Sequence, residues 1–322
     1  MLPLEPVSLE EIRAAQGRIA GSAIRTPLVH LNVDEAPAEI YLKLENLQPI
    51  GSFKLRGAGN AIGVASRAAL ARGVYTASAG NMAQGVAWNA LRLGLECTVI
   101  VPDHAPKIKL AAIERLGARI IKVPFETWWR VLAEREYPGM EGMFVHPVSD
   151  PAVIAGNATI GLEILEDLPD VDTVIVPYGG GGLSCGIACT FRALKPGTKV
   201  YACEVETAAP LSAAFAAGTP RTIDYTPSFV DGIGGKSVLK EMWPLARQLL
   251  AGSLVVSLAE VAAALRLLAE RNRVIAEGAG AAPVAAALAG KTAGGKVVCV
   301  VSGGNIDLEV LARILEGQVP TP

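Results

Sequence analysis

The chain has 322 residues, of which 51% are apolar, and its 29 basic residues nearly balance its 31 acidic ones. This length predicts about two domains and allows a sizeable core. The balanced charge argues against a nucleic-acid partner or an anionic membrane surface. Apolar runs stop well short of the ~18 residues of a membrane-spanning helix, and the N-terminus is too acidic for a secretion signal. We therefore expect a cytoplasmic protein with no membrane partner.

Short apolar runs alternate with Ala/Leu-rich stretches of helical period, which predicts mostly parallel sheets covered by helices. The expected strands are residues 74–77, 97–101, 119–122, 173–177, 199–204 and 296–301, and the expected helices include 84–93, 108–116, 183–193 and 258–271. Ser257 and Glu260 can form a capping box for the last of these helices. The β-α units between Arg72 and His146 predict a small domain at residues 72–146, and residues 1–71 plus 147–322 form the larger one.

The first candidate for chemistry is Lys54, in the sequence Gly-Ser-Phe-Lys-Leu-Arg-Gly that begins at Gly51. A lysine amine becomes nucleophilic when it loses its proton, and a partly apolar pocket lowers its pKa. The neighbouring Phe53 can supply such an apolar wall. Alone this is weak evidence, because most lysines are solvated surface charges.

Two polar loops that contain glycine follow expected strands. The asparagine loop, after residues 74–77, consists of Ser78, Ala79, Gly80, Asn81 and Met82. The serine loop, after residues 296–301, consists of Ser302, Gly303, Gly304 and Asn305. Open α/β sheets bind ligands at the carboxyl ends of their strands, and these loops offer hydroxyl, amide and backbone donors there. Either loop alone could be an ordinary helix cap, since Ser and Asn are good caps.

Four consecutive glycines, here called the anion loop, separate the expected strand 173–177 from a helical stretch. They are Gly179, Gly180, Gly181 and Gly182. Glycine lets backbone N–H groups approach an anion, and a helix N-terminus adds positive potential. The dinucleotide pattern G-x-G-x-x-G fails in every register, and no G-K-[ST] follows. A monophosphate therefore fits better than a pyrophosphate, with an ordinary glycine-rich turn as the alternative.

These motifs occur in the order found in fold-type II pyridoxal-phosphate (PLP) enzymes, and the chain most resembles the threonine/serine dehydratases and serine racemases. The similarity extends from Arg25 to Asn305. The resemblance implies PLP as cofactor and a tryptophan synthase β-like fold with two three-layer α/β domains. It also implies a homodimer that acts on a small amino-acid substrate.

The resemblance further implies a role for each matching residue. Lys54 is expected to hold PLP as an imine and then to move the proton on the substrate Cα. Phe53 and Gly232 are expected to flank the pyridine ring, Asn81 to bind its 3-hydroxyl and Ser302 to bind its nitrogen. The anion loop Gly179, Gly180, Gly181 and Gly182 is expected to hold the phosphate. The asparagine loop Ser78, Ala79, Gly80, Asn81 and Met82 is expected to bind the substrate and to clasp its carboxylate.

The implied reaction is that of an ammonia-lyase, which converts a β-hydroxy amino acid such as L-threonine or L-serine to a 2-oxo acid and ammonia. Ala79 stands where racemases of this group carry a second serine, so elimination is favoured over racemisation. Met82 stands where a histidine is usual, which leaves a bulkier or acidic substrate open, such as phenylserine or 3-hydroxyaspartate. A β-replacement, as in cysteine synthases, is disfavoured by the lysine context and the four glycines.

Many relatives bind a divalent cation at a Glu, a carbonyl and an Asp. Glu204 and Ala208 match the first two, but Pro210 replaces the Asp, so we expect no metal site. The end of the chain soon after the serine loop favours a catabolic enzyme without a regulatory domain. The cysteines are expected to be buried thiols, and His30, His104 and His146 to be surface or packing residues.

Overall fold

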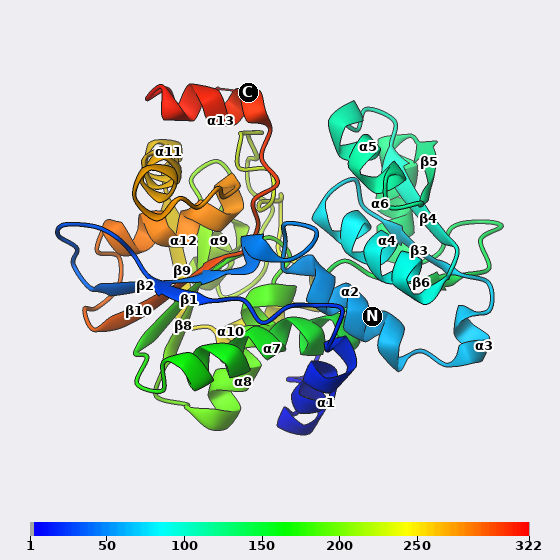
Figure 1. The fold of residues 1–322 in the computed structure, drawn as a ribbon, viewed down its shortest axis with the longest axis horizontal. Helices are drawn as coiled ribbons and strands as arrows, with labels where there is room; N and C mark the ends of the chain where they lie inside the picture. The colour runs from blue at the N-terminus through cyan, green and yellow to red at the C-terminus, as the bar shows by residue number, and fades with distance from the viewer. Residues whose placement is uncertain (1–2, 322) are drawn as a thin grey trace.

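A computed structural model describes residues 3–321, which form two sheets with helices packed against them (Figure 1). The strands are β1 (Leu28–His30), β2 (Glu39–Leu44), β3 (Val74–Ala77), β4 (Cys97–Pro102), β5 (Arg119–Val123), β6 (Met143–Phe144), β7 (Thr173–Pro177), β8 (Lys199–Val205), β9 (Gly252–Val256) and β10 (Lys296–Val301). The α-helices are α1 (Leu9–Ile19), α2 (Lys54–Val64), α3 (Arg67–Leu70), α4 (Asn81–Leu93), α5 (Lys107–Glu114), α6 (Phe125–Glu134), α7 (Pro151–Asp167), α8 (Gly182–Leu194), α9 (Pro210–Ala217), α10 (Trp243–Leu249), α11 (Leu258–Leu267), α12 (Gly278–Leu288) and α13 (Leu308–Leu315). A 3-10 turn, η1 (Glu45–Leu47), and a π-helical turn, η2 (Leu268–Asn272), are also present. Within the described chain, no helix is both long and apolar enough to cross a membrane.

The large sheet has the strand order β1-β2-β10-β7-β8-β9, and its neighbours pair in parallel except for β1 with β2. Its central strands β7 and β10 are apolar except at their first residues, Thr173 and Lys296, because helices cover both faces. Successive side chains point to opposite faces. Val174 and Val176 of β7 thus join the core beneath α7 and α8, whereas Ile175 joins the core beneath α11 and α12. The predicted α/β fold with a mostly parallel sheet is confirmed.

The small sheet has the order β5-β4-β3-β6, and all of its pairs are parallel. Its four strands lie between Val74 and Phe144, inside the range expected for the small domain. One of its two cores also contains Ala58, Ala61 and Ile62 of α2, which precede that range. The division into residues 72–146 and the remainder therefore stays a prediction.

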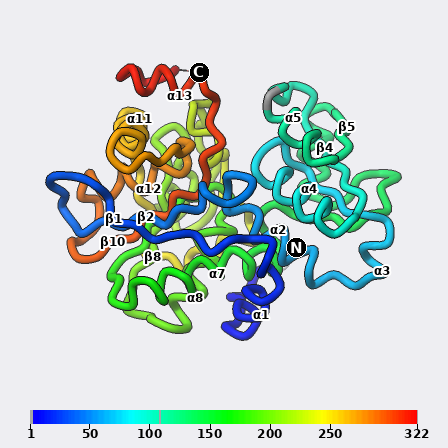
Figure 2. The backbone as a smooth tube through the Cα atoms, viewed as in Figure 1, coloured from blue at the N-terminus to red at the C-terminus, as the bar shows by residue number. Residues whose placement is uncertain are grey.

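Helix α2 lies between the two halves of the molecule, where it packs against α7 on the large-sheet side and α4 on the small-sheet side (Figure 2). Glycines make these close approaches possible. If these glycines carried a side chain, the Cβ atom at Gly156 of α7 would lie only 2.5 Å from the Arg56 carbonyl oxygen. The Cβ atom at Gly85 of α4 would lie 3.0 Å from the Lys54 carbonyl oxygen. Both helices are thereby held against the first turn of α2, where Lys54 lies.

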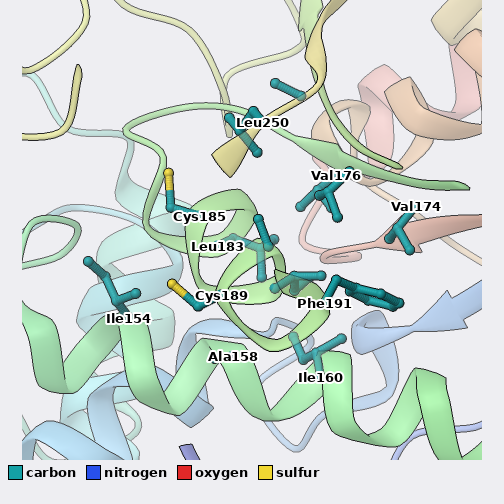
Figure 3. Packing of buried hydrophobic residues seen from close by; sticks show 14 of the residues in the cluster. Ile154, Ala158, Ile160, Val174, Val176, Leu183, Cys185, Cys189, Phe191 and Leu250 are labelled. Atoms are coloured by element: carbon teal, nitrogen blue, oxygen red, sulfur yellow. The ribbon is translucent and has the colours of Figure 1, made fainter. Parts of the chain in front are cut away.

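The core between α7 and α8 is built mostly from small and branched side chains, together with Phe191 (Figure 3). A Cβ at Gly186 would lie 2.7 Å from the Ile154 carbonyl, so the two helices approach closely there. Cys185 and Cys189 pack in this core. In the described chain all five cysteines are buried and form no disulfide, as the sequence predicts. Burial raises the pKa of Cys189 to about 11, which leaves its thiol protonated and inert.

Several element boundaries agree with the sequence pattern, and others differ for identifiable reasons. Strands β3, β7 and β10 coincide with the expected runs, and the predicted capping box of Ser257 and Glu260 is present. The helix expected to reach Arg271 ends as an α-helix at Leu267 and continues as the π-turn η2. Strands β1, β2, β6 and β9 lie outside the expected set, because they are short or interrupted by polar residues.

A buried cluster of charged side chains ties α2 to the large half of the molecule. The Arg56 guanidinium donates to both carboxylate oxygens of Glu45 at 2.8 Å and to Glu163 at 2.6 and 2.9 Å. Lys43 of β2 donates to Glu163 at 2.5 Å and to the Thr26 carbonyl at 2.7 Å. These charged groups satisfy one another in a region that water does not reach, and removal of one leaves others unpaired.

We expect Arg56→Met to lower the free energy of unfolding by about 3–5 kcal/mol, because it leaves the Glu45 and Glu163 carboxylates buried without their main partner. The matched control is Arg25→Met, which removes an arginine that pairs with Glu166 and Asp167 at the surface. That change should cost at most about 1 kcal/mol. Urea denaturation followed by circular dichroism measures both variants. Equal losses in the two variants would contradict the importance of the buried cluster.

Candidate active site

A cavity of about 390 Å³ lies between the two sheets. Its lining residues follow the carboxyl ends of strands from both sheets, the position at which open α/β sheets bind ligands. The residues predicted for the site all line this cavity, namely Phe53, Lys54, Ser78, Ala79, Gly80, Asn81, Met82, Gly179, Gly180, Gly181, Gly182, Gly232 and Ser302. The structure thus brings together five segments far apart in the sequence, while the individual roles stay predictions.

Lys54 is the first residue of α2, and its amine lies inside the cavity. The Nζ atom donates to the Pro147 carbonyl at 2.8 Å and lies 5.2 Å from the centre of the Phe53 ring. Burial lowers the pKa of Lys54 to about 8, although the Glu277 carboxylate acts in the opposite direction. A substantial fraction of the amine is therefore unprotonated near neutral pH, as a nucleophile or a general base requires.

His146 precedes the carbonyl that holds this amine. Its Nδ1 atom accepts from the backbone N–H groups of Val148 and Ser149 at 3.1 and 2.9 Å. Burial, helped by the charge of Arg135, lowers the pKa of His146 to about 3. The ring is therefore neutral and supports the turn around Pro147, which is the packing role that the sequence predicts.

The anion loop connects β7 to α8 and leaves the first turn of that helix without a side-chain cap. Gly181 has a φ of 95°, in the region that favours glycine. A Cβ at Gly180 would lie 2.5 Å from Val148, and one at Gly182 would lie 2.8 Å from the Val148 carbonyl. Backbone N–H groups at the start of α8 are thus available to an anion of the size of a phosphate.

Glu277 belongs to no motif that the sequence displays, yet it faces the predicted site residues. The Asn81 amide donates to its two carboxylate oxygens at 3.0 and 3.1 Å, and Asn305 donates to Asn81 at 2.8 Å. Burial raises the pKa of Glu277 to about 7, with the Asn81 hydrogen bond acting against the rise. The sequence signal is a single acidic residue directly before the Gly- and Ala-rich helix α12.

The backbone around Glu277 is shaped to admit this carboxylate. A Cβ at Gly303 would lie 2.6 Å from its Oε1 atom, and one at Gly232 would lie 3.2 Å from the same atom. The Glu277 N–H donates to the Gly303 carbonyl at 2.9 Å, and the Phe53 N–H donates to the Ser302 carbonyl at 3.0 Å. The serine loop, the segment that contains Lys54 (the lysine motif, residues 51–57) and Glu277 are therefore held together by backbone hydrogen bonds.

The small-sheet side of the cavity contains residues that no motif indicates. They are Pro102, His104, Ala105, Lys109, Phe125 and Trp128. His104 was expected to be a surface or packing residue. Its side chain is mostly exposed, but it also lines the cavity, so that expectation is incomplete. Lys109 of α5 reaches across the entrance and pairs with Asp231 of the large half at 2.5 Å.

Glu204 lies at the position that resembles a cation ligand in relatives. Its oxygens accept from the N–H groups of Leu211 and Ser212 at 2.8 Å and from the Ser253 hydroxyl at 2.6 Å. Burial raises its pKa, which these hydrogen bonds partly offset. The carboxylate is thus engaged at the start of α9.

Comparisons with known proteins agree with this site. A model of the family described as "Pyridoxal-phosphate dependent enzyme" matches residues 19–303. The L-threonine ammonia-lyase of Thermotoga maritima is 41% identical over 96% of this chain and 78% of that protein. The catabolic L-threonine dehydratase TdcB of Escherichia coli strain K12 is 38% identical over 96% of each chain.

The solved structure of maize serine racemase is also similar. It superposes with a TM-score of 0.89 at 31% identity and covers 97% of this chain and 98% of its own. The shared fold, the match along most of the sequence and the cavity that contains both Lys54 and the anion loop lead to one conclusion. This chain belongs to the pyridoxal-phosphate dependent enzyme family.

Proposed function

We propose that this protein is a PLP-dependent ammonia-lyase that converts a β-hydroxy amino acid such as L-threonine or L-serine to a 2-oxo acid and ammonia. The observation that carries the proposal is the buried Lys54 amine, with a pKa of about 8, in one cavity with the anion loop and the asparagine loop. The relatives from Thermotoga maritima and Escherichia coli are named as an L-threonine ammonia-lyase and an L-threonine dehydratase, which supports this substrate class.

The residues present fit PLP. The anion loop offers uncapped N–H groups for the phosphate, and Phe53 offers an aromatic face next to the Lys54 amine. Asn81 and Ser302 offer an amide and a hydroxyl to the ring, and Gly232 lines the same cavity. When bound, PLP withdraws electrons from the substrate Cα and makes its proton acidic.

The protein's own part in the reaction is to position the substrate and to move protons. Ser78, Gly80 and Asn81 surround the substrate carboxylate, and Lys54 removes the Cα proton. Ser302 is a neutral partner for the ring nitrogen, so it does not force protonation there as a carboxylate would. This arrangement favours loss of the β-hydroxyl over storage of charge at Cα.

Ala79 favours elimination over the alternative racemase reaction. The residue lines the cavity beside Ser78 but carries no proton to give. Lys54 is then the acid/base that acts on Cα. Any proton given back to Cα before the β-hydroxyl leaves comes from the side of Lys54, so the configuration is kept. We further propose that the enzyme acts in the cytoplasm as a homodimer, which the resemblance to its family implies. The balanced charge of the chain supports the absence of a nucleic-acid partner.

The first test of this proposal measures the 2-oxo acid and the ammonia that the purified protein releases from L-threonine and L-serine. We expect equal amounts of the two products and a visible absorbance band from bound PLP. Lys54→Ala should abolish the band and lower turnover by at least about 10²-fold, because the general base is lost. A protein that stays colourless with added PLP, or an active Lys54→Ala variant, would contradict the proposal.

The pH dependence of PLP attachment reports on Lys54. After PLP is added to cofactor-free protein, the rate of band formation should rise with pH through about 8, where the amine loses its proton. Glu277→Gln removes the charge that raises this pKa, so the rise should move to lower pH. Glu270→Gln, at an exposed carboxylate on η2, is the control and should leave the profile unchanged. A shift to higher pH in Glu277→Gln would show that the sign is wrong.

Ala79→Ser tests the basis of reaction choice. A hydroxyl at this position supplies a second proton donor at Cα, so the ratio of inverted amino acid to 2-oxo acid should rise several-fold. After incubation with L-serine, chiral chromatography measures the D-serine formed, and a 2-oxo acid assay measures the elimination product. An unchanged ratio would argue against the assigned role of position 79.

A further inference from the structure

The cavity has two chemically different sides. On the large-sheet side lie the glycines of the anion loop, with Ser302 and Glu277. On the small-sheet side lie the side chains here called the apolar wall, namely Met82, Pro102, Ala105, Phe125 and Trp128. The phosphate and the ring of PLP are expected to contact the large-sheet side. The side chain of the substrate therefore faces the apolar wall on the small-sheet side.

The order of strands in the small sheet arranges this wall in space. The asparagine loop follows β3, Pro102 and Ala105 lie at the end of β4, and Phe125 begins the helix that follows β5. These three strands are direct neighbours in the order β5-β4-β3. Since neighbouring strands lie about 5 Å apart, the start of α6 after β5 is about 10 Å along the sheet from the start of the asparagine loop after β3.

The aromatic end of the wall is a packed pair. Phe125 and Trp128 are three residues apart in α6, on one face of the helix. Their ring centres are 5.6 Å apart with a 36° angle between planes. Trp128 also packs against a buried cluster that includes Tyr75, Ile100 and Val131, which holds the pair in place. Phe125 remains 48% exposed, so an apolar ligand at this end would remove aromatic surface from water.

The charges in the cavity argue against an acidic substrate side chain. Among the described residues that line it, the lysines are Lys54 and Lys109. Lys54 has the catalytic position, and Lys109 is already paired with Asp231 at 2.5 Å. The imidazole of His104 lies beside the Asp103 carboxylate, at 3.2 Å, and its side chain is 67% exposed. An added carboxylate would therefore face Asp231 and an apolar wall without a cation reserved for it.

We propose that the apolar wall binds the substituent on the substrate Cβ, and that the enzyme accepts β-hydroxy amino acids with apolar groups larger than methyl, including an aromatic ring. The inference rests on the proposed ammonia-lyase activity and names its substrate class. The methyl group of threonine ends one bond beyond Cβ, whereas a phenyl group extends several bonds further and so presents a larger apolar surface to Phe125 and Trp128. Phenylserine would lose its Cα proton and its β-hydroxyl as water, and water would then release ammonia, which leaves phenylpyruvate.

The test compares kcat/KM for L-threo-phenylserine, L-threonine and 3-hydroxyaspartate, followed by 2-oxo acid release from the PLP-loaded enzyme. The wild type should turn over phenylserine at least within tenfold of L-threonine and should discriminate against 3-hydroxyaspartate. Trp128→Ser should lower kcat/KM for phenylserine by about tenfold or more, since comparable losses follow small changes in apolar pockets. L-threonine should change much less, and Trp128→Phe should retain most of the phenylserine activity.

Trp129→Ser is the matched control, because Trp129 is the next residue in α6, is 53% exposed and is absent from the cavity lining. It should leave the ratio of the two kcat/KM values unchanged. Phe125→Ser provides a second test at a more exposed position, in case Trp128→Ser does not fold.

The outcomes separate this inference from the proposed function. Turnover of L-threonine without turnover of phenylserine, or equal losses for both substrates in Trp128→Ser and Phe125→Ser, would overturn the apolar-wall assignment and leave the lyase proposal standing. Preference for 3-hydroxyaspartate would also overturn it. Absence of 2-oxo acid from every substrate would overturn the ammonia-lyase proposal, and the assignment with it.

Discussion

The buried arginine in the first turn of α2 is the interaction on which the site depends. Arg56 cannot lose its proton, and its planar guanidinium binds Glu45 and Glu163 at the same time. These carboxylates come from η1 and α7, so the arginine fixes the start of α2 against two different elements. Lys54 lies two residues earlier, and this arrangement places its amine within hydrogen-bond distance of the Pro147 carbonyl. A rotation of α2 would leave buried charges unpaired, which is why the helix has one stable position.

The position of α2 also explains why the cavity has two different sides. The helix packs on α7 of the large half and on α4 of the small half, with glycines at both contacts. Lys54 therefore stands where a polar side, rich in glycine, meets an apolar side. Binding of the phosphate and ring of PLP requires backbone N–H groups and glycines that let the backbone come close to the cofactor. Binding of a substrate side chain requires an apolar surface of matching shape. The two requirements are met by different sheets.

The protonation of Lys54 results from a balance between burial and one nearby charge. Burial alone disfavours the ammonium form, and Glu277 partly restores it, which leaves the pKa at about 8. Glu277 is itself held by Asn81, with room provided by Gly303 and Gly232. The asparagine loop thus takes part in tuning the lysine as well as in the expected binding of cofactor and substrate.

Much of the fold could be predicted from the sequence, because continuous apolar runs such as β7 and β10 can be stable only in a sheet covered on both faces. The family was also evident, since the lysine motif, the two loops and the anion loop occur in a fixed order. Strands β1 and β2 were not evident, because β1 has only three residues and β2 contains Glu39 and Lys43. The polar side chains of β2 find partners only in the folded protein.

The local sequence determined which backbone segments could hold an anion and which lysine had a suitable motif, because glycine runs and strand ends act locally. Tertiary structure decided the rest. Glu277, Phe125 and Trp128 carry no motif, and they reach the cavity only because the start of α12 and the ends of distant strands lie at the same place. The pKa of Lys54 likewise depends on burial by residues from both sheets. Such properties arise from long-range packing, which no short stretch of sequence contains.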